Sequence, residues 1–175
     1  AQGEKVPPSV RAASADALRR LGIDPTSLNT VSQFLDLAER FYYDNAAVRA
    51  DTRDPDAKAN IWFWDSSKGL QRSAVPPQIF NELMAMRSAE YALSLGESPE
   101  ALALWLAANY KREAELPEGE QDPTRQENQP PAHFYGVTAG PRYLNMALSR
   151  ALTDRNSAVA LPVIRSLQNI VGQSN

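Results

Sequence analysis

The chain has 175 residues, 43% of them hydrophobic, and a formal net charge of −3. This length and composition predict one domain over residues 1–175, and the absence of a basic excess argues against nucleic acid as a partner. The chain has no cysteine, which excludes disulfides and thiolate metal sites. No apolar run approaches the roughly 20 residues that span a bilayer, so we expect no membrane span.

The first part of the chain predicts two helices. Residues 1–8 are polar with two adjacent prolines, and we expect a frayed lead-in. Apolar spacing predicts a short helix over 9–21 and a longer one over 31–50, packed together as an antiparallel hairpin. Thr30 and Gln33 have the spacing of a capping box at the start of the second helix. Its predicted inner face comprises Val31, Phe34, Leu35, Ala38, Phe41 and Tyr42.

The hydrophobic period changes to strand-like alternation in one place, and we predict a small β-hairpin near 60–75. Alternation places Ile61 and Phe63 on one face and Trp62 and Trp64 on the other. The loop between the two strands ends in glycine, where a positive φ is often required. Because an isolated hairpin is marginal in water, it must pack against the helices.

The chain is organised around two helices, predicted between residues 77 and 113 and joined by a very short turn. Gly96 suits a left-handed residue that ends the first helix, Ser98 can cap the second, and Pro99 fits its first position. Such a short turn makes the two helices antiparallel neighbours. The second helix is expected to bury a stripe formed by Leu102, Leu106 and Tyr110.

Residues 116–131 lose all periodicity and contain four prolines. Together with the acidic residues around them, this composition predicts a mobile, solvated loop. A helix beginning at 140–141 and a last helix follow, and Asn156 is the expected cap of the last one. Pro162 lies inside the last helix and should kink it or mark its true start. One face of that helix is predicted to comprise Val159, Val163, Leu167 and Ile170.

Two helical segments echo one another. The triplet ALS at 92–94 recurs at 147–149, and ALAL at 101–104 recurs as AVAL at 158–161. Stacked helical hairpins that share faces are the physical meaning of such an echo. We therefore expect the helix pairs 78–112 and 141–171 to superpose, with Leu102 and Val159 at equivalent buried positions.

The last echo segment, DRNSAVALPVIRSLQNIVG, resembles the second helix of a HEAT or armadillo-type repeat. It departs from that pattern at Ala160, where such repeats often carry arginine. The central pair, ALSLGESPEALALWLAANY, is similar to a tetratricopeptide-style turn, and the stretch WFWD at 62–65 is similar to one in uncharacterised bacterial HEAT-repeat proteins. The residues that carry the HEAT or armadillo likeness are Asp154, Asn156, Val159, Ile164, Leu167 and Ile170.

The resemblance covers residues 60–172 and implies a fold class: all-α, with an α–α superhelix of stacked antiparallel helical hairpins and one small β-hairpin. It also implies a single helical-repeat domain that forms part of a longer repeat protein and binds other proteins. It carries no catalytic residue across to this chain.

The residue types give little support to catalysis. His133 is the only histidine, and it stands beside the Pro-rich loop in a chain without a Gly-x-Ser-x-Gly elbow, so a loop-anchoring role is favoured. Paired carboxylates could serve a glycosidase, but helical glutamates are usually solvated, as we expect of Glu82, Glu90 and Glu100. We expect no enzyme and no catalytic residue.

Metal and nucleotide binding are also disfavoured. Asp51, Asp54 and Asp56 are close in sequence but lack the glycine and the terminal glutamate of a calcium loop, so an exposed acidic turn is expected. No glycine-rich phosphate loop occurs. We expect no metal and no cofactor.

The aromatic residues are the main candidates for a binding surface. We expect most of them to lie in the core, with one of Trp62 or Trp64 as the exposed exception. Arg87 projects near the apolar sector of its helix and can pair with Glu90 or stack on Tyr91. The aromatic group comprises Trp62, Trp64, Trp105, Tyr42, Tyr43, Tyr91 and Tyr110. The candidate binding residues are Trp62, Trp64, Tyr43 and Arg87.

The favoured function is a non-enzymatic scaffold that binds a protein or peptide partner. The alternative is a carbohydrate- or peptide-binding module that uses exposed aromatic residues around Trp62 and Trp64. The chain begins with AQG and no methionine, which favours an exported or periplasmic protein over a cytoplasmic one.

Overall fold

The computed structural model describes residues 6–50 and 57–173. The predicted mainly helical fold with one β-hairpin is confirmed. Asp51, Asp54 and Asp56, and most of the lead-in predicted at 1–8, lie outside the described residues. The elements are α1 (Pro8–Arg20), α2 (Thr30–Tyr42), β1 (Ala59–Asp65), β2 (Gly69–Val75), α3 (Pro77–Leu95), α4 (Pro99–Glu115), α5 (Ala132–Ala139), α6 (Pro141–Thr153) and α7 (Ser157–Gln173).

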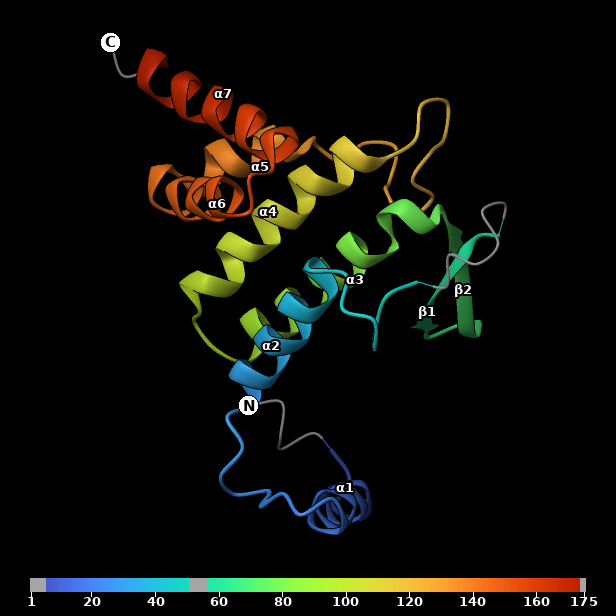
Figure 1. The fold of residues 1–175 in the computed structure, drawn as a ribbon. Coiled ribbons are helices and arrows are strands. Elements are labelled where there is room, and N and C mark those ends of the chain that lie inside the picture. Colours follow the sequence, from blue (N-terminus) through green and yellow to red (C-terminus); the bar gives the residue numbers. More distant parts are fainter. Residues whose placement is uncertain (1–5, 51–56, 174–175) are drawn as a thin grey trace.

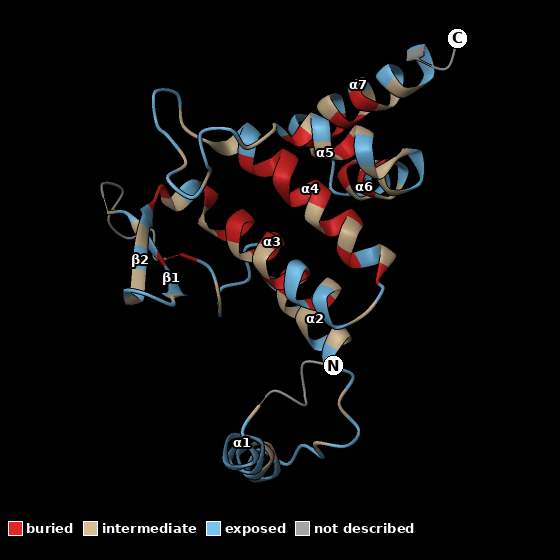
Figure 2. Cartoon of the chain, turned by 180° about the vertical axis from the view of Figure 1, so that it is seen from behind, coloured by how far each residue is buried: buried red, intermediate tan, exposed pale blue. Residues whose placement is uncertain are grey.

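Helix α4 is the centre of the molecule (Figure 1). Helix α3 packs against one side of it, and α6 and α7 pack against the other. Leu104 and Leu106 are almost completely buried, whereas Leu102 is only partly buried. The predicted stripe was therefore too narrow, because other helices cover α4 on more than one side. Figure 2 shows buried residues along most of α4.

The short turn between α3 and α4 forms largely as predicted. The Ser98 hydroxyl accepts a hydrogen bond from the Ala101 N–H at 3.1 Å, and Pro99 is the first helical residue. Gly96 has φ 177° and is extended, so the left-handed conformation predicted for it is wrong. Helix α3 ends at Leu95, where the Gly96 N–H still donates to the Ala92 carbonyl oxygen.

Helix α2 buries the predicted face, with Ala38, Phe41 and Tyr42 in the core. Its bounds differ from the prediction. The side chain of Asn29, not Thr30, caps the helix by accepting from the Ser32 N–H at 3.1 Å. The helix ends at Tyr42 because the chain turns at Asp44, which has a φ of 52°.

Helix α1 buries none of its residues and lies apart from the helical body (Figures 1 and 2). The antiparallel hairpin predicted for the first two helices is therefore wrong. Helix α1 has little apolar surface to bury, because it contains few large apolar residues and carries three arginines, Arg11, Arg19 and Arg20.

Helix α7 continues through Pro162 over its whole length. Asn156 accepts from the Val159 N–H at 3.2 Å, which confirms its predicted role as a cap. Val159 and Val163 are fully buried, and Leu167 and Ile170 pack against the same cluster. No helix within the described residues combines the length and the apolar character needed to cross a lipid bilayer.

Candidate functional site

The β-hairpin presents one exposed face that carries both candidate tryptophans. Trp62 is 51% exposed, Trp64 is 75% exposed, and Leu70, opposite Trp64, is 61% exposed. Arg72 lies opposite Trp62 and is the single charged residue of this face. The expectation that only one tryptophan is exposed is wrong, since residues two apart in a strand share a face. We name this face the hairpin outer face; it comprises Asn60, Trp62, Trp64, Leu70, Arg72 and Ala74.

The opposite face of the hairpin holds it to the helical body. Ile61 and Val75 are buried in a cluster with Ile79 and Leu83 of α3. Arg87, also on α3, donates a hydrogen bond from Nη1 to the carbonyl oxygen of Trp62 at 2.6 Å. This bond replaces the partners predicted for Arg87. A hairpin that would be marginal alone is thereby fixed with its outer face toward solvent.

The turn of the hairpin is internally braced. Asp65 Oδ1 accepts hydrogen bonds from the backbone N–H groups of Ser67 and Lys68, each at 2.8 Å, and from the Ser67 hydroxyl at 2.6 Å. These bonds hold the pKa of Asp65 below its ordinary value. Gly69 has φ 74°, a conformation that favours glycine. The strand register that places Trp64 beside Leu70 is therefore set by the turn.

A cleft of about 510 Å³ lies beneath the hairpin, between it, α3 and the segment 116–131. Apolar side chains from β1 and α3 form its floor: Ile61, Phe63, Leu83 and Met86. Arg87 and Arg112 contribute charged groups to its wall. The cleft and the outer face are on opposite sides of the hairpin, so they are separate surfaces.

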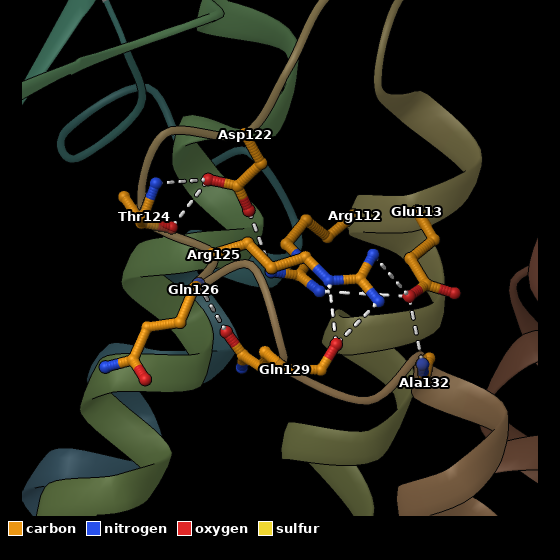
Figure 3. A network of polar contacts seen from close by, with 8 residues as sticks. All are labelled: Arg112, Glu113, Asp122, Thr124, Arg125, Gln126, Gln129 and Ala132. Carbon is orange, nitrogen blue, oxygen red and sulfur yellow. Dashed lines mark hydrogen bonds and ion pairs between the residues drawn. The ribbon is translucent and has the colours of Figure 1, made fainter.

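Segment 116–131 runs from α4 to α5 and is held to α4 by ion pairs (Figure 3). Arg112 Nη1 lies 2.7 Å from Asp122 Oδ2, and both side chains are almost completely buried. Arg125 donates to the Gln129 carbonyl oxygen and lies 3.5 Å from Glu113. The mobility predicted for this loop stays a prediction.

Tyr43 belongs to a different part of the molecule. Its hydroxyl accepts a hydrogen bond from Arg150 Nη1 of α6 at 2.8 Å, and Arg150 also pairs with Glu39 of α2 at 2.6 Å. Tyr43 is 51% exposed, and its hydroxyl also donates to the carboxylate of Asp154 at 3.3 Å. Trp62 and Trp64 thus share the hairpin outer face, whereas Arg87 reaches only the backbone of Trp62 from the cleft side. Tyr43 lies where Arg150 of α6 meets α2.

Four charged residues meet where α2, α3 and α4 pack together. Lys111 Nζ lies 2.8 Å from Glu82 Oε1, 3.4 Å from Asp44 Oδ2 and 3.8 Å from Glu115 Oε1. Glu82 is 1% exposed, so the expectation of a solvated glutamate is wrong for it. We name Asp44, Glu82, Lys111 and Glu115 the acidic cluster.

Burial sets the proton affinities of the acidic cluster. It raises the pKa of Glu115 to about 7, and the carboxylate of Glu82 adds to the shift. Burial also raises the pKa of Glu82, although Lys111 opposes the shift. Burial works against the charge of Lys111 too, but the Glu82 carboxylate outweighs it and holds the pKa of Lys111 above its ordinary value. The two glutamates therefore retain protons at higher pH than isolated carboxyls.

Sequence reasoning missed this cluster because its members lie on separate elements. Glu82 stands among residues of α3 that are buried on every side, and no periodic signal separates it from a solvated glutamate. The one sequence signal for a buried Glu82 is the apolar composition around it, because a charged residue in an apolar environment needs a partner of opposite charge.

His133 anchors α5 to α7. Its Nδ1 lies 2.8 Å from the Ser166 hydroxyl, which is also 2.6 Å from the Tyr110 hydroxyl. Ser166 is fully buried and donates to the Pro162 carbonyl oxygen at 3.0 Å. A substrate has no access to this serine, so the His–Ser pair has the geometry of a structural contact.

Throughout residues 6–50 and 57–173, no three His, Asp or Glu side chains are placed to hold a metal ion. Comparisons of the chain with protein-family models, with curated proteins and with solved structures found no match.

Proposed function

We propose that this chain is a non-enzymatic scaffold that binds a protein partner through the hairpin outer face. The observation that carries the proposal is the joint exposure of Trp62, Trp64 and Leu70 on one braced hairpin. Contiguous exposed apolar side chains are uncommon on a protein surface unless they meet another molecule.

The composition of the face supports a polypeptide as its partner. Tryptophan and arginine are enriched among the residues that dominate protein–protein affinity. Arg72 is the one charge on this face, and no acidic residue accompanies it there. The complementary surface is an apolar patch beside a carboxylate, because Arg pairs with carboxylates in a bidentate manner.

The HEAT or armadillo-type superhelix is part of the same proposal. Helices α3 and α4 form one antiparallel hairpin, α6 and α7 form the next, and α4 contacts α6. Consecutive hairpins in contact are the building pattern of helical solenoids. In this proposal, the helical body holds the β-hairpin at a fixed orientation for the partner.

Selection of peptides from a displayed random library tests the proposed surface. Peptides selected on the full chain should bind it saturably and lose affinity at least tenfold for the double variant Trp62→Ala/Trp64→Ala, since hot-spot truncations cost more than about 1.4 kcal/mol. Leu161→Ala is the matched control, because Leu161 is 56% exposed on α7. Equal binding to the double variant would place the binding surface elsewhere.

An oligosaccharide is the second candidate ligand. The two indoles lie two residues apart on one strand face, so both rings are available to stack on sugar rings. A saturable shift of tryptophan fluorescence with oligosaccharides, lost in Trp64→Ala, would favour this candidate over the protein-binding scaffold. Trp105→Phe controls for the remaining indole, which donates to Glu90.

A further inference from the structure

The cleft beneath the hairpin has the composition of a small-molecule site, and the proposed function does not use it. Its volume of about 510 Å³ lies within the range of roughly 300–1,000 Å³ that is typical of ligand pockets. Apolar side chains supply most of the lining surface, and polar or charged side chains complete the wall, among them Arg87, Glu90 and Arg112. Apolar lining with a small number of placed polar groups is the usual make-up of such pockets.

Arg87 is the cation of the cleft that has no carboxylate partner among the described residues. Its Nη1 donates to the Trp62 carbonyl oxygen at 2.6 Å, and this contact orients the guanidinium. Among the described residues, that carbonyl is its sole hydrogen-bond partner. The remaining N–H groups of its planar fork are therefore free for an acceptor, and a carboxylate fits the fork best.

The other charges around the cleft are already engaged. Arg112 pairs with Asp122 at 2.7 Å, which neutralises it. Glu90 accepts from the indole N–H of Trp105 at 2.8 Å. Arg87 is thus the cation of the cleft that lacks a counter-ion within the described residues, and it stands beside an apolar floor.

We infer that this cleft binds a small apolar carboxylate. Its aryl or branched-alkyl body packs on Ile61, Phe63, Leu83 and Met86, and its carboxylate pairs with the free N–H groups of Arg87. Burial of the apolar body supplies affinity, and the charged pair supplies selectivity for the acid.

Methionine methyl groups report this binding directly. The chain has three methionines: Met86 lines the cleft, whereas Met84 does not, and Met146 lines another cavity. Phenylpropionate, titrated into the full chain with isotope-labelled methionine methyl groups, should shift the NMR signal of Met86 saturably. The signals of Met84 and Met146 should stay in place. No shift of the Met86 signal at millimolar ligand would overturn the inference.

Matched probes and variants test the role of the charge. Phenylpropanamide has the same shape without the charge and should bind at least tenfold more weakly, as should phenylpropionate to Arg87→Gln. Arg72→Gln removes the same charge from the outer face and should leave the affinity unchanged. Equal binding of acid and amide to the wild-type chain overturns the inference. Tighter binding of phenylpropylamine also overturns it, because Glu90 would then be the recognising group.

Two further comparisons keep the test independent of folding and of the proposed function. If Arg87→Gln disturbs the fold, the NMR signals of Met84 and Met146 will shift in the variant without ligand. In that case the affinities of the wild-type chain for the acid and for the amide test the role of the charge. Trp62→Ala/Trp64→Ala should keep its affinity for phenylpropionate, since both side chains lie on the other side of the hairpin. The tryptophan double variant should therefore lose peptide binding only, and Arg87→Gln should lose binding of the acid.

Discussion

A large apolar side chain stabilises a fold in proportion to the surface that it removes from water. Trp64 is 75% exposed, whereas Leu106 is 1% exposed at the centre of α4. The larger side chain therefore contributes less to folding. Retaining an exposed indole on the hairpin is consistent with a role in binding, because folding gains little from it.

Single substitutions measure this difference. Trp62→Ala and Trp64→Ala should each lower the free energy of unfolding by about 1 kcal/mol or less, the size of a cross-strand pair. Leu106→Ala should lower it by about 2–5 kcal/mol, because it leaves a cavity in the core. Urea denaturation of the three variants gives the comparison. A cost for Trp64→Ala as large as that for Leu106→Ala would show that the hairpin outer face is packed in solution.

At the scale of elements, one of the ion pairs that hold segment 116–131 to α4 is almost completely buried. Arg112 and Asp122 are 4% and 5% exposed, so removal of one charge leaves the other buried without its counter-ion. The segment also forms one wall of the cleft, through Pro123, Thr124 and Gln126. The attachment of the segment to α4 therefore affects the shape of the cleft as well as the conformation of the segment.

Limited proteolysis tests this attachment. Asp122→Asn should be cleaved within 116–131 several times faster than the wild-type chain, because local opening is less costly without the ion pair. Glu127→Gln is the control, since Glu127 is an exposed acid of the same segment. Equal cleavage rates for the three proteins would mean that the ion pair does not govern opening of the segment.

At the scale of the whole molecule, the acidic cluster makes the stability of the fold depend on pH. Its members come from the end of α2, from α3 and from α4, so the cluster lies where three helices meet. Glu115 has an ordinary pKa of 4.5 and a pKa of about 7 in the folded protein. Between these values the folded state binds more protons than the unfolded state, so stability falls as pH rises.

Chemical denaturation between pH 5 and pH 8 tests this linkage. The contribution of Glu115 is fully present below its unfolded pKa of 4.5 and is lost as the pH rises through about 7. Glu115→Gln should therefore lose less stability than the wild-type chain over this range. Glu118→Gln, at an exposed position, should follow the wild-type chain. Parallel curves for Glu115→Gln and the wild-type chain would contradict the assigned shift.

The local structure of this protein follows from neighbouring residues. The alternation of residues 60–75 predicted the hairpin, and the capping roles of Ser98 and Asn156 were correct. Alternation also placed Trp62 and Trp64 on one face. Each of these features depends on contacts within a few residues, so the sequence alone contains the relevant physics.

Burial and the sites were decided by the tertiary structure. Glu82 and Lys111 are 29 residues apart (111 − 82) and meet because α3 packs on α4. Leu102 and Leu106 differ in burial although they lie on one helical face, because helices cover α4 unevenly. The cleft needs β1, α3 and segment 116–131 together. Such contacts depend on how distant elements pack, and periodicity within one element cannot determine that packing.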